Sequence, residues 1–118
     1  MKLFVYGLLK EGYSLNSVLS KSKKIGDYTT KCKGLVMSGF SYPFIWENKY
    51  SKYNIKGELY EVNKSDLQNA NRIELGAGYN LKELDKDIFG YVYPEPIELN
   101  SSRVDVNDEE KYYEWRER

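Results

Sequence analysis

Short runs that contain β-branched and aromatic residues, separated by glycine and proline, recur along this sequence and limit its fold more than any other feature. Such runs predict strands, here at residues 2–6, 25–37, 44–46, 53–62, 79–84 and 88–93. Only two segments, residues 14–19 and 63–74, show clear helical signals. Because these helices interrupt a mostly antiparallel set of strands, we expect an α+β fold, a small, mostly antiparallel β-barrel with flanking helices.

The length and the C-terminal segment define the expected domain. A chain of 118 residues is typical of one domain, so we expect a single domain over residues 1–118 with its core in residues 1–93. In residues 94–118, acidic side chains at 108–110 precede Arg116 and Arg118. This order suits a helix dipole, and we expect a terminal helix or a frayed end there.

The absence of histidine and the single cysteine, Cys32, narrow the possible chemistry. Catalysis by serine–histidine–aspartate or cysteine–histidine groups is excluded, as are histidine-ligated metals and histidine general bases. Cys32 can form neither an intrachain disulfide nor a cysteine zinc site, and we expect it to be a buried structural residue. Any catalysis therefore depends on carboxylates, lysines, tyrosines or the backbone.

No membrane segment or signal peptide is expected. The sequence has no run of about 18 apolar residues. Its N-terminal strand reaches Gly7 too early for a signal peptide. We therefore expect a soluble, cytoplasmic protein with no membrane partner.

The net charge is zero, but the two halves of the chain differ in sign. Residues 1–56 carry ten lysines and arginines against three acids (+7), and residues 57–118 carry eight against fifteen (−7). The lysine cluster within residues 21–33 is either solvated surface or an anion-attracting rim. The twelve tyrosines either line cleft walls or form a stacking surface for a planar ligand. Without an arginine-rich face, we expect no nucleic-acid partner.

Glu74 is the strongest candidate for chemistry because of its place on the predicted helix over residues 63–74. At 100° per residue it lies only about 20° from Leu67 around the helix axis, so a helix that buries Leu67 also turns Glu74 inward. Ser65 and Gln68 suggest a capping box at the start of this helix. Glu74 is then a carboxylate bonded to tyrosines or lysines, a helix-end residue turned to solvent, or a general base whose pKa burial raises.

A second candidate is the loop that follows the first strand, where Gly7 separates the strand from the helical segment at 14–19. Backbone N–H groups in such a loop can bind an anion or a carbonyl oxygen. The pattern is equally typical of an ordinary turn, so it does not indicate a function by itself.

Several motifs in order resemble the gamma-glutamylcyclotransferase-like family, and most closely its gamma-glutamylamine cyclotransferase branch. They are the run from Val5 to Gly12 followed by Asn16 and Leu19, the pair Tyr42-Pro43, the strand Gly57-Glu58-Leu59-Tyr60-Glu61-Val62, the segment Ala70-Asn71-Arg72-Ile73-Glu74 followed by Tyr79, and the closing strand Tyr91-Val92-Tyr93. The resemblance spans residues 3–93.

This resemblance implies a function and a set of site residues. It implies an enzyme in which the α-amine of a small-molecule γ-glutamyl substrate attacks the γ-amide carbonyl and releases 5-oxoproline and a free amine. Glu74 is the implied catalytic acid and base, and no cofactor or metal is required. The implied substrate-binding residues are the loop Tyr6, Gly7, Leu8 and Leu9, together with the pocket residues Tyr60 and Tyr79.

The sequence also departs from the family pattern. Leu8 stands where the family usually has threonine, Asn71 replaces an aspartate and Ala70 a leucine, and Leu81 replaces the arginine of a Tyr-x-Arg motif. None of these changes removes the proposed base, but they affect substrate recognition. The alternative function is therefore a non-catalytic small-ligand-binding or interaction protein on the same fold. The residues do not indicate the leaving amine or the oligomeric state.

Overall fold

A computed structural model describes residues 1–39, 41–96 and 102–117 of the chain. It contains one α-helix, α1 (Lys64–Gly76), and a short 3-10 helix, η1 (Asn16–Leu19). The strands within the described residues are β1 (Lys2–Val5), β2 (Lys23–Thr29), β3 (Leu35–Gly39), β4 (Pro43–Glu47), β5 (Asn54–Glu61), β6 (Asn80–Asp85), β7 (Ile88–Val92), β8 (Val104–Asn107) and β9 (Tyr112–Trp115).

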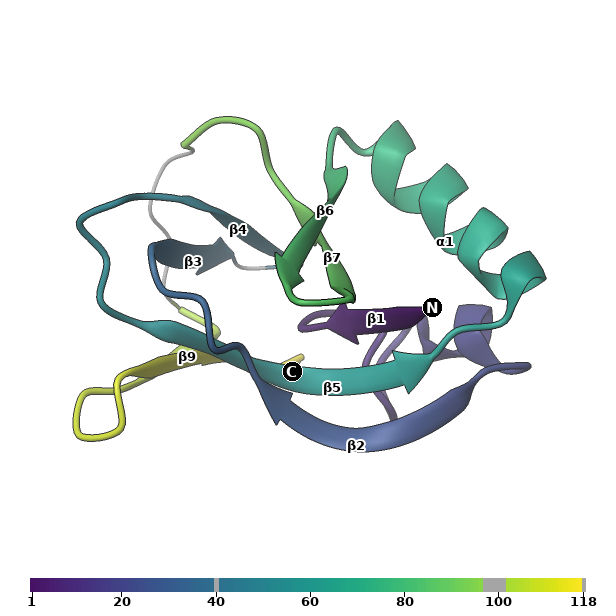
Figure 1. Cartoon of the computed structure of the whole chain (residues 1–118), viewed down its shortest axis with the longest axis horizontal. Coiled ribbons are helices and arrows are strands. Elements are labelled where there is room, and N and C mark those ends of the chain that lie inside the picture. The colour runs from purple at the N-terminus through teal and green to yellow at the C-terminus, as the bar shows by residue number, and fades with distance from the viewer. Residues whose placement is uncertain (40, 97–101, 118) are drawn as a thin grey trace.

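Seven of these strands form a mixed sheet in the order β6-β7-β1-β5-β9-β8, with β2 paired to β5 outside this path (Figure 1). The pairs β1–β7 and β5–β9 are parallel, and the other pairs are antiparallel. Strands β3 and β4 form a separate two-stranded sheet. The fold is therefore α+β, as the order of the predicted elements indicated.

The expected barrel is not confirmed. A barrel requires the two edge strands of a sheet to pair with each other, and within the described residues the edge strands β6 and β8 pair only with β7 and β9. The separate β3–β4 pair lies beside the sheet, where the Tyr93 N–H donates to the Ile45 carbonyl (2.8 Å) at the end of β7. The sheet thus stays open.

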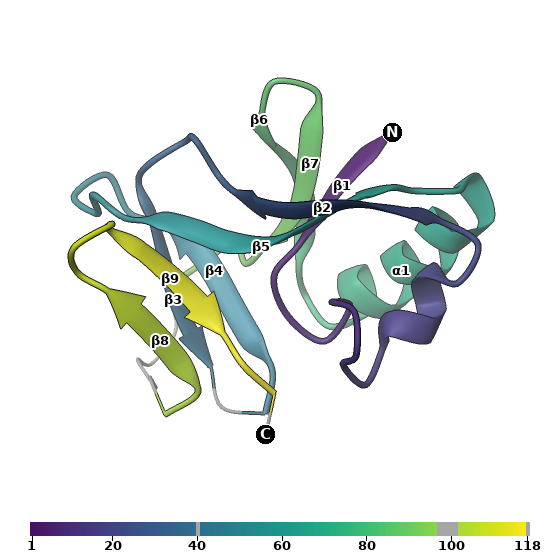
Figure 2. The same cartoon turned by 90° about the horizontal axis from the view of Figure 1, so that it is seen from below.

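Strand β1 lies at the centre of the core and separates two hydrophobic clusters. Its side chains alternate between the two faces, as the period of a strand requires. Leu3 and Val5 pack in the cluster beneath α1, and Phe4 and Tyr6 pack in the cluster beneath β3, β4 and β9. Both faces are covered, which explains why this short strand is apolar after the exposed Lys2. Figure 2 shows α1 and η1 together at one end of the molecule and β3, β4, β8 and β9 at the other.

The start of α1 differs from the predicted capping box. Asn63, not Ser65, is the N-cap, and its side-chain oxygen accepts from the N–H groups of Ser65 (2.8 Å) and Asp66 (3.2 Å). The Asp66 carboxylate accepts from the Lys21 N–H and the Ser22 hydroxyl, both at 2.8 Å. These bonds attach the first turn of α1 to the segment after η1 and fix the direction of the helix.

The prediction of one strand over residues 25–37 was wrong, because the chain leaves β2 after Thr29 and enters β3 at Leu35. The Asp85 carboxylate fixes the non-strand conformation of this connection, because it accepts from the N–H groups of Lys31 and Cys32, both at 2.8 Å. Gly34 has a φ of +87°, a conformation that favours glycine. Cys32 lies in this connection and is only partly buried, although it packs against the core.

The predicted helix or frayed end in residues 94–118 was also wrong for the described part of that segment. Residues 102–117 contain β8 and β9, and β9 pairs with β5. Trp115 is fully buried in the same cluster as Phe4 and Ile55, so the core extends well beyond residue 93. The remaining residues of this prediction, 97–101 and 118, lie outside the described part of the chain.

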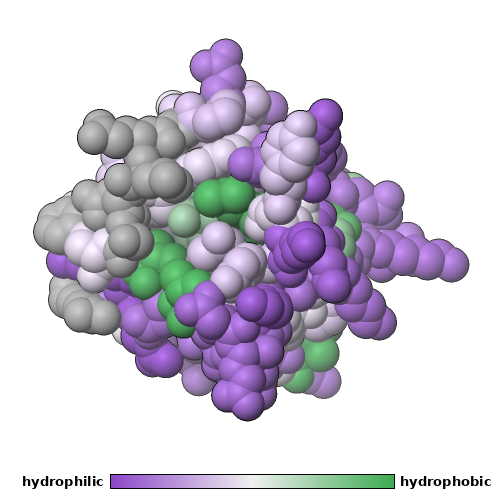
Figure 3. Space-filling model, turned by 90° about the vertical axis from the view of Figure 1, so that its left-hand side faces the viewer, coloured by the Kyte–Doolittle hydropathy of each residue, from purple (hydrophilic) through white to green (hydrophobic). Residues whose placement is uncertain are grey.

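Hydrophilic residues cover most of the face shown in Figure 3, where hydrophobic atoms form small separate groups. No helix in the described ranges is long and apolar enough to cross a membrane.

Candidate active site

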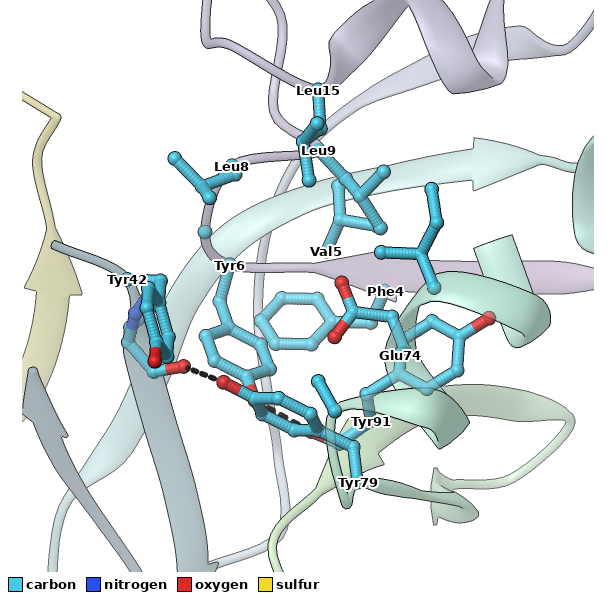
Figure 4. A pocket seen from close by; sticks show the side chains of 14 residues that line it. Phe4, Val5, Tyr6, Leu8, Leu9, Leu15, Tyr42, Glu74, Tyr79 and Tyr91 are labelled. Carbon is cyan, nitrogen blue, oxygen red and sulfur yellow. Dashed lines mark hydrogen bonds between the residues drawn. The ribbon is translucent and has the colours of Figure 1, made fainter. Parts of the chain in front are cut away.

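A cavity of about 190 Å³ lies between the end of β1, the loop after it, the C-terminal end of α1 and the start of β4 (Figure 4). Aliphatic and aromatic side chains form most of its wall. Its lining residues are Phe4, Val5, Tyr6, Gly7, Leu8, Leu9, Leu15, Tyr42, Pro43, Ile73, Glu74, Ala77, Tyr79 and Tyr91.

Glu74 reaches this cavity from the last turn of α1. Figure 4 shows its carboxylate projecting inward, between the loop that carries Leu8 and Leu9 and the ring of Tyr79. The side chain is partly buried, and no described residue forms a hydrogen bond or an ion pair with its carboxylate. The helix places Glu74 on the inward side that its spacing from Leu67 predicted, without the tyrosine or lysine partner that a purely structural carboxylate would have.

The electrostatics of this carboxylate follow from its apolar surroundings. Burial disfavours the charged form of a carboxyl group, and here it raises the pKa of Glu74 to about 7. The same burial, together with the negative charge of Glu74, raises the pKa of Tyr6, Tyr79 and Tyr91. The tyrosines therefore remain protonated near neutral pH, and Glu74 is the group in the cavity that can exchange a proton there.

Hydrogen bonds to the protein fix the three tyrosine side chains. The Tyr6 hydroxyl donates to the Tyr91 carbonyl (2.6 Å), and the Tyr79 hydroxyl donates to the Pro43 carbonyl (2.7 Å). The Tyr91 hydroxyl donates to the side-chain oxygen of Asn71 (2.7 Å). With their protons directed to these acceptors, the tyrosines form a rigid wall around Glu74.

The loop after β1 forms the opposite side of the cavity. Gly7 packs so closely on Pro43 that a Cβ at this position would lie 2.6 Å from the proline Cγ. Among the described residues, the N–H groups of Gly7, Leu8 and Leu9 donate no hydrogen bond. These donors are available to a ligand that enters the cavity.

Two buried polar contacts hold this loop in place. The Lys10 side chain is only 5% exposed, and its Nζ donates to the Trp115 carbonyl (2.7 Å). The Asn16 side-chain amide donates to the Leu9 carbonyl (2.8 Å) and to the Tyr60 hydroxyl (3.0 Å). The loop is thus attached both to β9 and to β5.

Six of the seven predicted site residues line the cavity: Glu74, Tyr6, Gly7, Leu8, Leu9 and Tyr79. Tyr60 is absent from the lining. Its ring packs in the cluster beneath α1, and its hydroxyl contacts the loop only through Asn16. Sequence reasoning assigned no role to Tyr42, Pro43 and Tyr91, although the motifs that carry the family resemblance contain all three.

A metal site is not evident in the described part of the chain. No group of three or more cysteine, aspartate or glutamate side chains there is arranged to hold a metal ion. In the cavity, Glu74 is the only residue of these types among the lining residues.

Comparison with known proteins shows which family this chain belongs to. Residues 3–117 match the family described as "Gamma-glutamyl cyclotransferase, AIG2-like". The chain belongs to this family. A relative from Pyrococcus horikoshii, named "Putative gamma-glutamylcyclotransferase PH0828", is 31% identical over 90 residues, which cover 71% of this chain and 68% of the relative.

Solved structures show the same fold. The crystal structure of the P. horikoshii protein has a TM-score of 0.72 at 27% identity, and the match covers 85% of this chain and 83% of that one. The structure of a mouse AIG2-like protein has a TM-score of 0.61 at 20% identity and covers 99% of this chain and 97% of that one. The second likeness concerns the fold alone. The gamma-glutamyl cyclotransferase, AIG2-like fold thus extends over β8 and β9 as well as the N-terminal core.

Proposed function

We propose that this protein is an enzyme that cyclises γ-glutamyl amides to 5-oxoproline and a free amine, with Glu74 as the proton carrier. Family membership suggests cyclotransferase-type activity. The observation that carries the proposal is the Glu74 carboxylate, unpartnered among the described residues, with its pKa raised to about 7 in an otherwise uncharged cavity.

The reaction needs no nucleophile from the protein. The α-nitrogen of the substrate forms a bond to its own γ-carbonyl carbon, and the bond from that carbon to the amide nitrogen breaks. Closing a five-membered ring inside a cavity that holds both groups gives an effective concentration on the order of 10⁵ M or more. A chain without histidine, serine or cysteine nucleophiles at this cavity is compatible with such chemistry.

Proton transfer is the part of the reaction that the protein has to supply. The α-ammonium loses two protons as its nitrogen becomes the ring amide, and the leaving nitrogen gains two as it departs as an ammonium. Glu74 accepts each proton and passes it on, so that it ends the reaction in its starting state. A carboxyl group with a pKa near the working pH performs both steps well.

The loop opposite Glu74 holds the reacting carbonyl. The available N–H groups of Gly7, Leu8 and Leu9 donate to the oxygen of the γ-carbonyl, which becomes negative during the attack. Donors of this kind are worth about 3 kcal/mol each in other enzymes. The anchors at Lys10 and Asn16 keep the loop rigid, which such preorganised stabilisation requires.

The test is release of 5-oxoproline from a panel of γ-glutamyl amides by the wild-type protein and by Glu74→Gln. We expect release by the wild type and a loss of at least about a hundredfold in kcat/KM for the variant. Unchanged turnover by Glu74→Gln would overturn the assigned mechanism. Tight binding of an amide without release of 5-oxoproline would instead support the non-catalytic alternative.

A further inference from the structure

The lining of the cavity differs between its floor and its mouth, and this difference bears on the substrate. Val5, Tyr6 and Leu9 at the floor are buried. At the mouth, Leu8 and Leu15 are partly exposed, Ile73 is 40% exposed and Tyr42 is 49% exposed. Side chains that line a cavity and still contact solvent mark its entrance. Apart from the partly exposed Glu74 and the hydroxyl of Tyr42, the entrance is apolar.

The size of the cavity indicates which part of a substrate it can hold. Sites for drug-sized ligands have volumes of about 300–1,000 Å³, and this cavity, with about 190 Å³, is smaller. It holds one group of about the size of an amino acid. If the γ-glutamyl group occupies the floor, where its amine reaches Glu74, the leaving amine lies at the mouth.

The charges at the site disfavour a leaving amine that carries a second charged group at its far end. Glu74 is the only charged side chain among the described lining residues, and in the proposed reaction it faces the α-ammonium. A second carboxylate, on the leaving amine, would be repelled by Glu74 and by the α-carboxylate of the γ-glutamyl group, and would find no lysine or arginine in the lining. An ammonium at its far end would lose water against Leu8, Leu15 and Ile73, which costs free energy without a compensating partner.

We propose that the substrates are γ-glutamyl amides of simple alkylamines, which carry no charged group besides the leaving nitrogen, and that the alkyl chain packs against Leu8, Leu15 and Ile73 at the mouth of the cavity. This inference rests on the proposed function and specifies its leaving group. The alkyl chain of the bound amide covers apolar surface that is otherwise exposed to water, which favours binding.

The first experiment compares three γ-glutamyl amides whose amines have nearly the same length and differ at the far end. They are the amides of pentylamine, which ends in a methyl group, of putrescine, which ends in an ammonium, and of 4-aminobutanoate, which ends in a carboxylate. We expect kcat/KM for 5-oxoproline release to be at least about tenfold higher for the pentylamide than for either other amide. Equal values, or a preference for a charged end, would overturn the inference.

A matched pair of variants tests the place of contact. Ile73 and Leu75 are both exposed on the last turn of α1, by 40% and 48%, but only Ile73 lines the cavity. We expect Ile73→Ser to raise KM for the pentylamide severalfold and to reduce its advantage over the putrescine amide. Leu75→Ser should leave KM for both amides at the wild-type values. Equal effects of the two substitutions would contradict the assigned contact.

The outcomes also separate this inference from the proposed function. Release of 5-oxoproline from all three amides at similar rates would support the proposed reaction and overturn only the preference for an amine with an uncharged far end. If no amide of the wider panel released 5-oxoproline, both the proposed reaction and this inference would be overturned.

Discussion

Glu74 has to be ionised to accept a proton, and its surroundings determine the pH at which this occurs. Burial raises the pKa of Glu74 to about 7. We therefore expect kcat/KM for 5-oxoproline release to rise with pH up to about 7, and to fall about tenfold per pH unit below it. A pH profile between 5 and 9 on one γ-glutamyl amide measures this. An inflection below pH 5 would mean that a carboxyl group with an ordinary pKa is responsible.

The raised pKa of Glu74 also has a consequence for stability. In the unfolded chain a glutamate has a pKa of about 4.3, so the folded state holds its proton to higher pH than the unfolded state does. The contribution of Glu74 to the folding free energy is then most favourable below about pH 4 and becomes less favourable as pH rises from there to about 7. Ionised Glu74 thus destabilises the fold at pH 8.

We predict that Glu74→Gln is more stable than the wild type at pH 8, by on the order of 1–3 kcal/mol, and equally stable at pH 4. Urea unfolding at pH 4, 6 and 8 measures the difference. A variant that is less stable than the wild type at pH 8 would contradict the assigned surroundings of the carboxylate.

The helix α1 carries Glu74, and its own start depends on one side chain. Asn63 caps two N–H groups of the first turn, and loss of such a cap typically costs about 1 kcal/mol. We expect Asn63→Ala to lower the free energy of unfolding by about this amount. Ser65→Ala, at the cap that the sequence motif suggested, should lower it by less. A larger loss of stability for Ser65→Ala than for Asn63→Ala in urea unfolding would instead support the capping box at Ser65.

Elements that depend on local patterns could be predicted from the sequence. The strands β1, β4, β5, β6 and β7 lie within two residues of their predicted bounds. Most of them have apolar or β-branched residues between clear turns, and β6 alternates leucine with polar residues. The break between β2 and β3 could not be predicted, because Asp85, which holds it open, is more than fifty residues away. Strands β8 and β9 have four residues each, and the acidic residues 108–110 between them suggested the start of a helix instead.

The candidate site could be predicted only in part for the same reason. Helical spacing placed Glu74 inward, and a strand followed by glycine marked the loop after β1. Tyr42 and Tyr91 come from other segments that only the packing of β4 and β7 brings to this cavity. Tyr60 lies on a strand face that the sequence could not distinguish from the cavity wall. The roles of all these residues in catalysis stay predictions until activity is measured.

At the scale of the whole molecule, the C-terminal strands complete the core. Trp115 is fully buried, and its ring packs edge-on against the ring of Tyr13, with 5.9 Å between the ring centroids. Replacing a buried tryptophan by alanine costs about 3–5 kcal/mol, a large share of the stability of a typical domain. We therefore expect Trp115→Ala to lower the melting temperature strongly or to abolish cooperative unfolding.

Tyr50→Ala is the matched control for that prediction, because Tyr50 is an aromatic residue that is 80% exposed. Its loss should change the free energy of unfolding by no more than about 0.5 kcal/mol. Thermal and urea unfolding of both variants measure the difference. Similar effects of the two substitutions would mean that β9 is not part of the core.

The bond between Lys10 and the Trp115 carbonyl joins two residues that lie 105 positions apart in the chain. Ribosomes add about 5–20 residues per second, so the loop after β1 leaves the ribosome roughly 5–20 s before its anchor is made. During that interval the nascent chain has its N-terminal loop and lacks one of the two strands that hold it. The attachment of the cavity wall is therefore completed late in biosynthesis, and an interrupted chain that ends before β9 would hold this loop through β5 alone.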